Sequence, residues 1–132
     1  MAVIDASVWV AMLRKNDPFY DRCRDWWEAS IKAEIRLYVP SIVLAEVAAA
    51  VARRDDNNAH AIRALALVQE SGVGIIDVSL SLALRAAELG IKYRLRGCDA
   101  VYVALAEHLK VQLVTLDREQ LERTPKGLAS AP

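Results

Sequence analysis

Apolar and polar positions follow two patterns along this chain, short apolar runs and longer segments with helical spacing. The apolar runs predict strands at residues 2–5, 36–40, within 71–79 and at 111–117. Helical spacing predicts helices over much of residues 8–14, 18–34, 42–54, 60–70, 81–96 and 99–109, with a short helical turn after 117. Strands that alternate with helices, without a hairpin signal such as Asn-Gly, predict an α/β fold. We expect a mostly parallel central sheet with helices on both faces.

Capping and turn residues set the expected element boundaries. Ser7 and Asp17 are the expected N-caps of the first two helices, Pro18 follows at a first helical position, and Ser41 caps the third helix. Gly90 is expected to break or bend the helix over 81–96. The terminal segment TPKGLASAP has the composition of a frayed tail.

Length and composition indicate one globular domain over residues 1–132. Of the 132 residues, 55% are hydrophobic and 26% are charged, which favours a filled core over disorder. No apolar run approaches the roughly 20 residues that span a bilayer, and the two cysteines lack the spacing of a paired motif. We therefore expect a cytoplasmic protein with free thiols and no membrane association.

The net charge limits how this chain can bind nucleic acid. Acidic and basic residues number 17 each, so the formal net charge is zero. A protein without net positive charge has no global attraction for phosphate. Any contact with nucleic acid must come from a local cluster of cations.

Four acidic residues lie where elements of the predicted fold begin or end. Asp5 and Asp117 follow strands, Asp99 lies at a helix start, and Glu46 is the only charged residue within the apolar segment 42–52. In parallel sheets the ligand site lies beyond the carboxyl ends of the strands, near a change of strand order. The sequence therefore predicts that these acids share one cleft.

Each aspartate also has a structural interpretation, because aspartate is favoured as a helix cap. Glu46 is harder to explain in this way, since an unpaired carboxylate on a buried face costs several kcal/mol. Oxygen-only clusters suit Mg²⁺ or Mn²⁺, and such ions promote hydrolysis of phosphodiesters. Metal-dependent phosphodiester cleavage is the chemistry that the four acids favour together.

Three segments of the sequence resemble the blocks of the PIN-domain nucleases, and the short length resembles the VapC type of toxin ribonuclease. The segments are VIDASVWV, PSIVLAEVAAAVARR and RGCDAVYVALAEHLKVQLVTLDREQL, and they extend in the family's order from Val3 to Leu121. The resemblance implies a PIN-like three-layer sandwich and a Mg²⁺- or Mn²⁺-dependent endoribonuclease. The family often ends in a further strand, which the segment PKGLASAP supports poorly.

The resemblance also assigns roles to individual residues. It implies metal ligands at Asp5, Glu46, Asp99 and Asp117, and accessory polar positions at Ser7 and Thr115 that help to hold the ion or its water. We assign Asp5 and Asp99 as the core ligands, with Glu46 and Asp117 completing the pocket directly or through water. Binding of one metal ion and binding of two are both open at this level. The implied products carry a 5′-phosphate and a 3′-hydroxyl.

The implied partners are RNA, a small antitoxin and a second copy of the chain. Candidate phosphate contacts are the cations near the acids in sequence, namely Arg53, Arg94, Arg96 and Arg118. Transfer RNA and ribosomal RNA are both open as substrates. The antitoxin of such a pair places its C-terminal segment in a groove and blocks the acidic pocket.

Three alternatives to a toxin nuclease stay open at this level. A haloacid-dehalogenase-like phosphatase also has an aspartate after its first strand but requires a second one two residues later, where this chain has Ser7. A receiver-like module would bind Mg²⁺ without cleavage and would place an acid after its third strand, where only Asp77 comes near. A PIN domain that processes RNA without a toxin role is the third.

Overall fold

The central sheet is parallel throughout, with the strand order β3-β2-β1-β4-β5. The computed structural model describes residues 1–132. Its strands are β1 (Ala2–Ile4), β2 (Leu37–Pro40), β3 (Gly74–Ile76), β4 (Gln112–Val114) and β5 (Ala129–Ser130). The predicted α/β class and the parallel sheet are confirmed.

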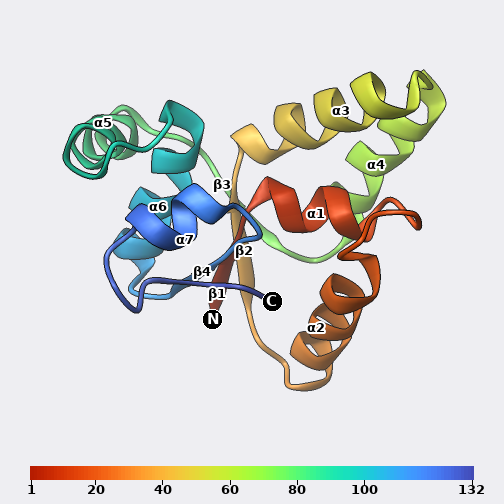
Figure 1. Ribbon diagram of the computed structural model, residues 1–132, viewed down its shortest axis with the longest axis horizontal. Coiled ribbons are helices and arrows are strands. Elements are labelled where there is room, and N and C mark those ends of the chain that lie inside the picture. The colour runs from red at the N-terminus through yellow and green to blue at the C-terminus, as the bar shows by residue number, and fades with distance from the viewer.

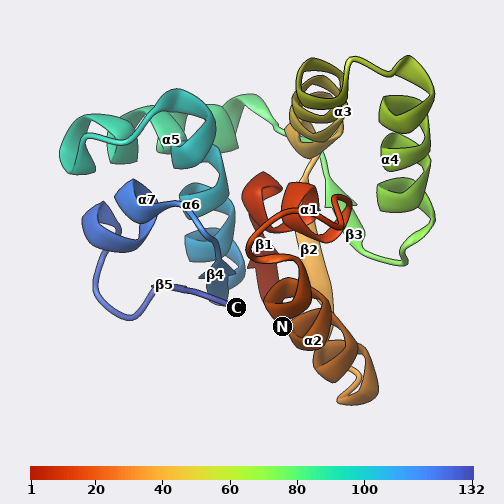
Figure 2. The same cartoon turned by 45° about the vertical axis from the view of Figure 1, so that its right-hand side comes forward.

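Seven helices cover the two faces of this sheet. Figure 2 shows α1 (Ala6–Met12), α2 (Tyr20–Lys32), α3 (Ile42–Asp55) and α4 (Asn58–Glu70) on one side, and α5 (Leu80–Tyr93), α6 (Gly97–Leu109) and α7 (Arg118–Arg123) on the other. Right-handed crossovers explain this division. The chain moves outward from β1 to β3 and then returns to β4, so the later helices lie on the opposite face.

Much of the fully buried core comes from the middle strands of the sheet and from α6. Val3 and Ile4 of β1, Leu113 of β4, and Tyr102 and Leu105 of α6 have no exposed surface. Strands buried on both faces are continuous apolar runs, as the sequence shows at β1. These elements form the rigid base from which the acidic side chains project.

The order of the strands creates a switch point between β1 and β4. From β1 the chain goes to β2 on one side and, after β3, to β4 on the other side. The crossovers therefore diverge at the carboxyl ends of β1 and β4 (Figure 1), where open α/β sheets bind their ligands. Asp5 directly follows β1, and Asp117 lies shortly after β4.

Three predicted caps are wrong in their details. Ser41 holds the N-cap position of α3, but its side chain forms no capping bond. Asp5, not Ser7, is the N-cap of α1, because its Oδ2 accepts from the Ser7 backbone N–H at 3.0 Å. Helix α2 begins at Tyr20, and Asp17 instead stabilises the preceding turn by accepting from the Phe19 N–H at 2.9 Å. At Asp5 and at Asp17, a carboxylate two residues before a free N–H forms the capping bond.

Two other expectations failed because tertiary contacts outweigh local preference. Helix α5 continues through Gly90, since burial of Ala86 and Leu89 against its neighbours exceeds the penalty of about 1 kcal/mol for a helical glycine. The C-terminal segment is not frayed, because Ala129 and Ser130 pair with the outer edge of β4 as strand β5. No helix in the structure has the length and apolar character needed to cross a membrane.

Candidate active site

The four predicted acids line one cleft of about 840 Å³. They come from four different elements, namely the end of β1 (Asp5), the second turn of α3 (Glu46), the first turn of α6 (Asp99) and the loop after β4 (Asp117). Positions 5 and 117 meet because parallel strands end at one edge of the sheet. Helices α3 and α6 bring the other two acids to the same edge from opposite faces.

Asp5 is the most buried of the four acids and is held at both oxygens. It is 5% exposed. Its Oδ2 accepts from the Ser7 N–H, and its Oδ1 accepts from Gln120 Nε2 at 3.3 Å. Gln120 has no exposed surface and also lies 3.5 Å from the Asp99 carbonyl oxygen through Nε2. The carboxylate is therefore fixed by its neighbours.

Gln120 was not found by sequence reasoning. A glutamine in a short polar helix is ordinarily exposed, so its type gives no signal for a buried role. The one usable signal is its spacing, three residues after Asp117, where the Gln120 N–H donates to the capping Asp117 Oδ1 at 2.9 Å. That cap begins α7 and turns the Gln120 side chain toward Asp5.

The two accessory hydroxyls lie next to Asp5. Thr115 Oγ1 is 3.3 Å from Asp5 Oδ2 and donates to Gln120 Oε1 at 2.5 Å. Ser7 Oγ accepts from the Leu116 N–H at 3.1 Å and lies 3.4 Å from Thr115 Oγ1. These contacts join the end of β4 to the start of α1, and they orient polar oxygens around the Asp5 carboxylate.

An arginine bridges two of the acids. Arg96 Nε donates to Asp99 Oδ2 at 2.9 Å and Arg96 Nη2 donates to Asp117 Oδ2 at 2.8 Å. Asp99 nevertheless has a raised pKa, because its burial disfavours the charged form more than the guanidinium favours it. Arg96 is itself 68% exposed, so solvent screens its attraction for the two carboxylates.

Glu46 is oriented by a buried phenol. The Tyr102 hydroxyl donates to Glu46 Oε1 at 2.7 Å, and Tyr102 has no exposed surface. Burial raises the pKa of Glu46; the Tyr102 hydrogen bond opposes this, and the nearby Asp5 and Asp99 charges add to it. Glu46 therefore bears a negative charge that this site disfavours unless a cation joins it.

The raised pKa of Glu46 predicts a pH-dependent stability that Glu46→Gln removes. The folded state binds the proton of Glu46 more tightly than the unfolded state does. The resulting contribution to the free energy of unfolding is therefore present below the unfolded pKa and is lost as pH rises through the folded pKa. In EDTA, the free energy of unfolding of Glu46→Gln should fall less than that of the wild type as pH rises through the pKa of Glu46. The variant should also be more stable than the wild type near pH 7. Urea unfolding at a series of pH values measures both effects.

Glu107→Gln is the control for that experiment. The Arg85 hydrogen bond lowers the pKa of the Glu107 carboxyl. Its contribution to the free energy of unfolding therefore has the opposite pH dependence and is lost as pH falls. A pH profile of Glu46→Gln that matches the wild type would contradict the assignment of an energetically disfavoured charge to Glu46.

The donor set fits a hard divalent cation. All four candidate side chains offer carboxylate oxygens, the type of ligand that Mg²⁺ and Mn²⁺ prefer. In this conformation, however, no three His, Cys, Asp or Glu side chains are grouped closely enough to bind one ion. Two of these carboxylates, Asp99 and Asp117, instead share Arg96, and Glu46 accepts from Tyr102.

The predicted phosphate contacts divide into two groups. Arg53 and Arg96 line the cleft, together with Arg54, which sequence reasoning missed. Arg94 does not line it; it ends α5 in a left-handed conformation and borders a different hollow, between α5 and α6. Arg118 is exposed at the start of α7, outside the lining of the cleft. Closeness to an acid in sequence therefore predicted a place in the cleft for Arg53 and Arg96 only.

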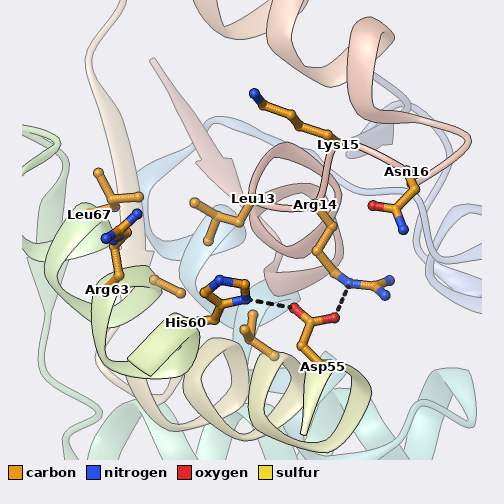
Figure 3. Close-up of a pocket in the computed structure, with 10 residues that line it drawn as sticks. Leu13, Arg14, Lys15, Asn16, Asp55, His60, Arg63 and Leu67 are labelled. Carbon is orange, nitrogen blue, oxygen red and sulfur yellow. Dashed lines mark hydrogen bonds and ion pairs between the residues drawn. The ribbon is translucent and has the colours of Figure 1, made fainter. Parts of the chain in front are cut away.

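A second polar hollow of about 550 Å³ lies among the ends of α1, α3 and α4 (Figure 3). Its single acid, Asp55, accepts from Arg14 Nε at 3.2 Å and lies 3.9 Å from His60 Nδ1. One carboxylate that already has a cationic partner cannot supply the ligands for a metal ion. Figure 3 shows the Arg14 and His60 side chains directed at Asp55, so the one carboxylate of this hollow is already engaged.

A match to a family model decides the family of this chain. The model of the PIN domain matches residues 2–127. This chain is a PIN domain. No curated protein sequence matches it.

Several solved structures share the fold of this PIN domain at low sequence identity. The Mycobacterium tuberculosis toxin VapC20, described as cleaving the Sarcin-Ricin loop, has a TM-score of 0.82 and 18% identity, covering 92% of this chain and 94% of that one. A toxin-antitoxin complex from Klebsiella pneumoniae has a TM-score of 0.74 and 20% identity, covering 100% of this chain and 98% of that one. VapBC2 of Rickettsia felis, bound to a promoter DNA fragment, has a TM-score of 0.76 and 19% identity, covering 98% of this chain and 97% of that one. These similarities establish the fold.

Proposed function

We propose that this PIN domain is a Mg²⁺- or Mn²⁺-dependent endoribonuclease and the toxin of a VapBC-type pair. The observation that supports the proposal is the single cleft lined by acids from four elements, at the switch point of the sheet. A PIN domain that uses the same site for RNA processing is the alternative, and its chemistry is identical.

The residues of the cleft have separable tasks in this proposal. Asp5 and Asp99 are the core ligands, and Glu46 and Asp117 complete the acidic set directly or through water. A bound divalent ion supplies electrophilic activation of the phosphate and of the attacking water. Ser7, Thr115 and Gln120 hold the Asp5 carboxylate in one orientation. Ligands fixed by a surrounding shell bind and act more efficiently than free ones.

Two alternative functions have little support in the arrangement of the side chains. A phosphatase with a second aspartate two residues after Asp5 is disfavoured, because Ser7 there forms hydrogen bonds to the end of β4. A receiver-like module is disfavoured because Asp77 lies after β3 and outside the lining of the acidic cleft.

A small antitoxin and a second copy of the chain are the proposed protein partners. The structures of similar fold include toxin-antitoxin complexes, which supports the first partner. Exposed Leu80, Leu84 and Ile91 on α5 support the second, because large apolar side chains gathered on one helix are typical of an interface. Sedimentation equilibrium should give a dimer for the wild type, and a monomer at all concentrations would contradict this part.

Incubation of the purified protein with total RNA tests the proposed activity. Cleavage should require Mg²⁺ or Mn²⁺ and stop in EDTA. Absence of cleavage with either ion, or cleavage that survives EDTA, would contradict it. A gene for a small basic DNA-binding protein immediately upstream would separate a toxin from an RNA-processing enzyme.

A further inference from the structure

The cleft extends beyond the four predicted acids, to a second wall with one further acid, Asp17. Phe19, Arg53 and Arg54 line the same cleft as Asp5 and Glu46. Arg53 lies seven residues after Glu46 on α3, or about 10 Å further along the helix axis. The connection from α1 to α2 and the end of α3 lie on the same side of the molecule, away from the strand ends (Figure 1). The cleft therefore has an acidic end and a second end with different chemistry.

Phe19 is an exposed aromatic side chain held in place by the backbone. It is the only phenylalanine in the chain and is 44% exposed. Among the large apolar side chains that are exposed, it alone lines this cleft. Its N–H donates to Asp17 Oδ1 at 2.9 Å, and its carbonyl accepts from the Cys23 N–H at 2.9 Å. Both backbone bonds fix the point from which the ring projects.

Arg53 and Arg54 are cations without acidic partners. Neither forms an ion pair, whereas Arg96 in the same cleft pairs with two carboxylates. Unpaired guanidinium groups are suited to phosphate, which they bind in a forked geometry. An aromatic side chain in one cleft with free cations is an arrangement by which proteins bind unpaired nucleotides.

We propose that Phe19 stacks an unpaired base of the RNA strand that is cleaved at the acids, while Arg53 and Arg54 bind phosphates of that strand. The inference rests on the proposed function and adds to it a residue, Phe19, that contacts an RNA base. A duplex cannot present a base to Phe19 without unpairing it, so the same sequence within a duplex should bind and be cut poorly. Stacking is tolerant of sequence, because every base has a π-face.

Phe19→Ala tests the stacking separately from cleavage. The probe is a short fluorescein-labelled RNA strand of mixed sequence, with binding followed by fluorescence anisotropy in EDTA. The variant should bind it about fivefold more weakly or worse. Phe19→Trp should bind like the wild type, because it restores an aromatic face. In Mg²⁺ the alanine variant should raise KM with little change in kcat.

Two controls separate base stacking from other causes. Ile62→Ala removes a 68% exposed apolar side chain from α4, outside the cleft, and should leave binding unchanged. A ribose-phosphate strand without bases should bind the wild type and Phe19→Ala equally, whereas Arg54→Gln should weaken both probes. If Phe19→Ala binds and cleaves the base-containing strand like the wild type, the stacking proposal is wrong while the nuclease stands. If the wild type neither binds nor cleaves RNA, the proposed function itself is wrong.

Discussion

Asp5→Asn should reduce RNA cleavage by about a hundredfold or more at saturating Mg²⁺. Asparagine keeps the shape of the side chain but lacks the negative charge, and loss of one ligand charge weakens both ion binding and charge stabilisation. Asparagine also caps helices as well as aspartate does, so α1 should remain intact. Initial rates on a fluorogenic RNA, with thermal unfolding of the same sample, measure activity and fold together.

Asp56→Asn is the matched control for this prediction. Asp56 is an exposed acid that ends α3 in a left-handed conformation, which asparagine adopts readily, and it lies outside the cleft. The control should cleave at the wild-type rate. Equal activity of Asp5→Asn and the wild type would contradict a catalytic role for the buried carboxylate.

Leu105→Ala should lower the free energy of unfolding by about 2–5 kcal/mol. Leu105 has no exposed surface, and its helix α6 packs against the middle strands β1, β2 and β4. Truncation leaves a cavity in a close-packed layer, so both transfer energy and contacts are lost. Thermal unfolding should show a decrease in Tm of roughly 10 °C or more.

Leu84→Ala provides the comparison for Leu105→Ala. The side chain is 58% exposed on α5, so its removal should change the stability of the monomer by no more than about 0.5 kcal/mol. The measurement belongs at low protein concentration, because Leu84 lies on the proposed dimer surface. Similar losses for the two variants would contradict the placement of α6 at the centre of the core.

The acids could be predicted from the sequence because they stand at element ends within apolar surroundings. Asp5 and Asp117 follow buried strands, and a polar residue at such a boundary marks the ligand edge of a parallel sheet. Glu46 interrupts an apolar helix face, where an unpaired carboxylate costs free energy, so its position indicated a site. The fold class followed from the same apolar runs.

The network around the acids could not be predicted in the same way. Gln120 and Tyr102 belong to residue types that are ordinary on a helix, and only tertiary packing directs them at Asp5 and Glu46. The cap of α1 was assigned to Ser7 because serine and aspartate are equally favoured there; the backbone geometry selects Asp5.

Nonlocal contacts also explain the errors at the C-terminus and among the cations. The segment Ala129–Ser130 has no strand pattern of its own, and it forms β5 because the edge of β4 offers unpaired backbone groups. Arg94 lies five residues before Asp99, yet the left-handed end of α5 directs it elsewhere. Sequence separation does not report distance once the chain reverses direction.

The chemistry of the RNA ends is the most direct test of the central claim, that the acidic cleft cleaves RNA by metal-dependent hydrolysis. A defined RNA with an unpaired loop would be incubated with metal-stripped protein in Mg²⁺ or EDTA, beside Asp5→Asn, and the fragments analysed by mass spectrometry. We expect 5′-phosphate and 3′-hydroxyl ends that form only in Mg²⁺ and only with Asp5 present. Fragments with 5′-hydroxyl ends that form equally in EDTA, or no fragments in Mg²⁺, would contradict it.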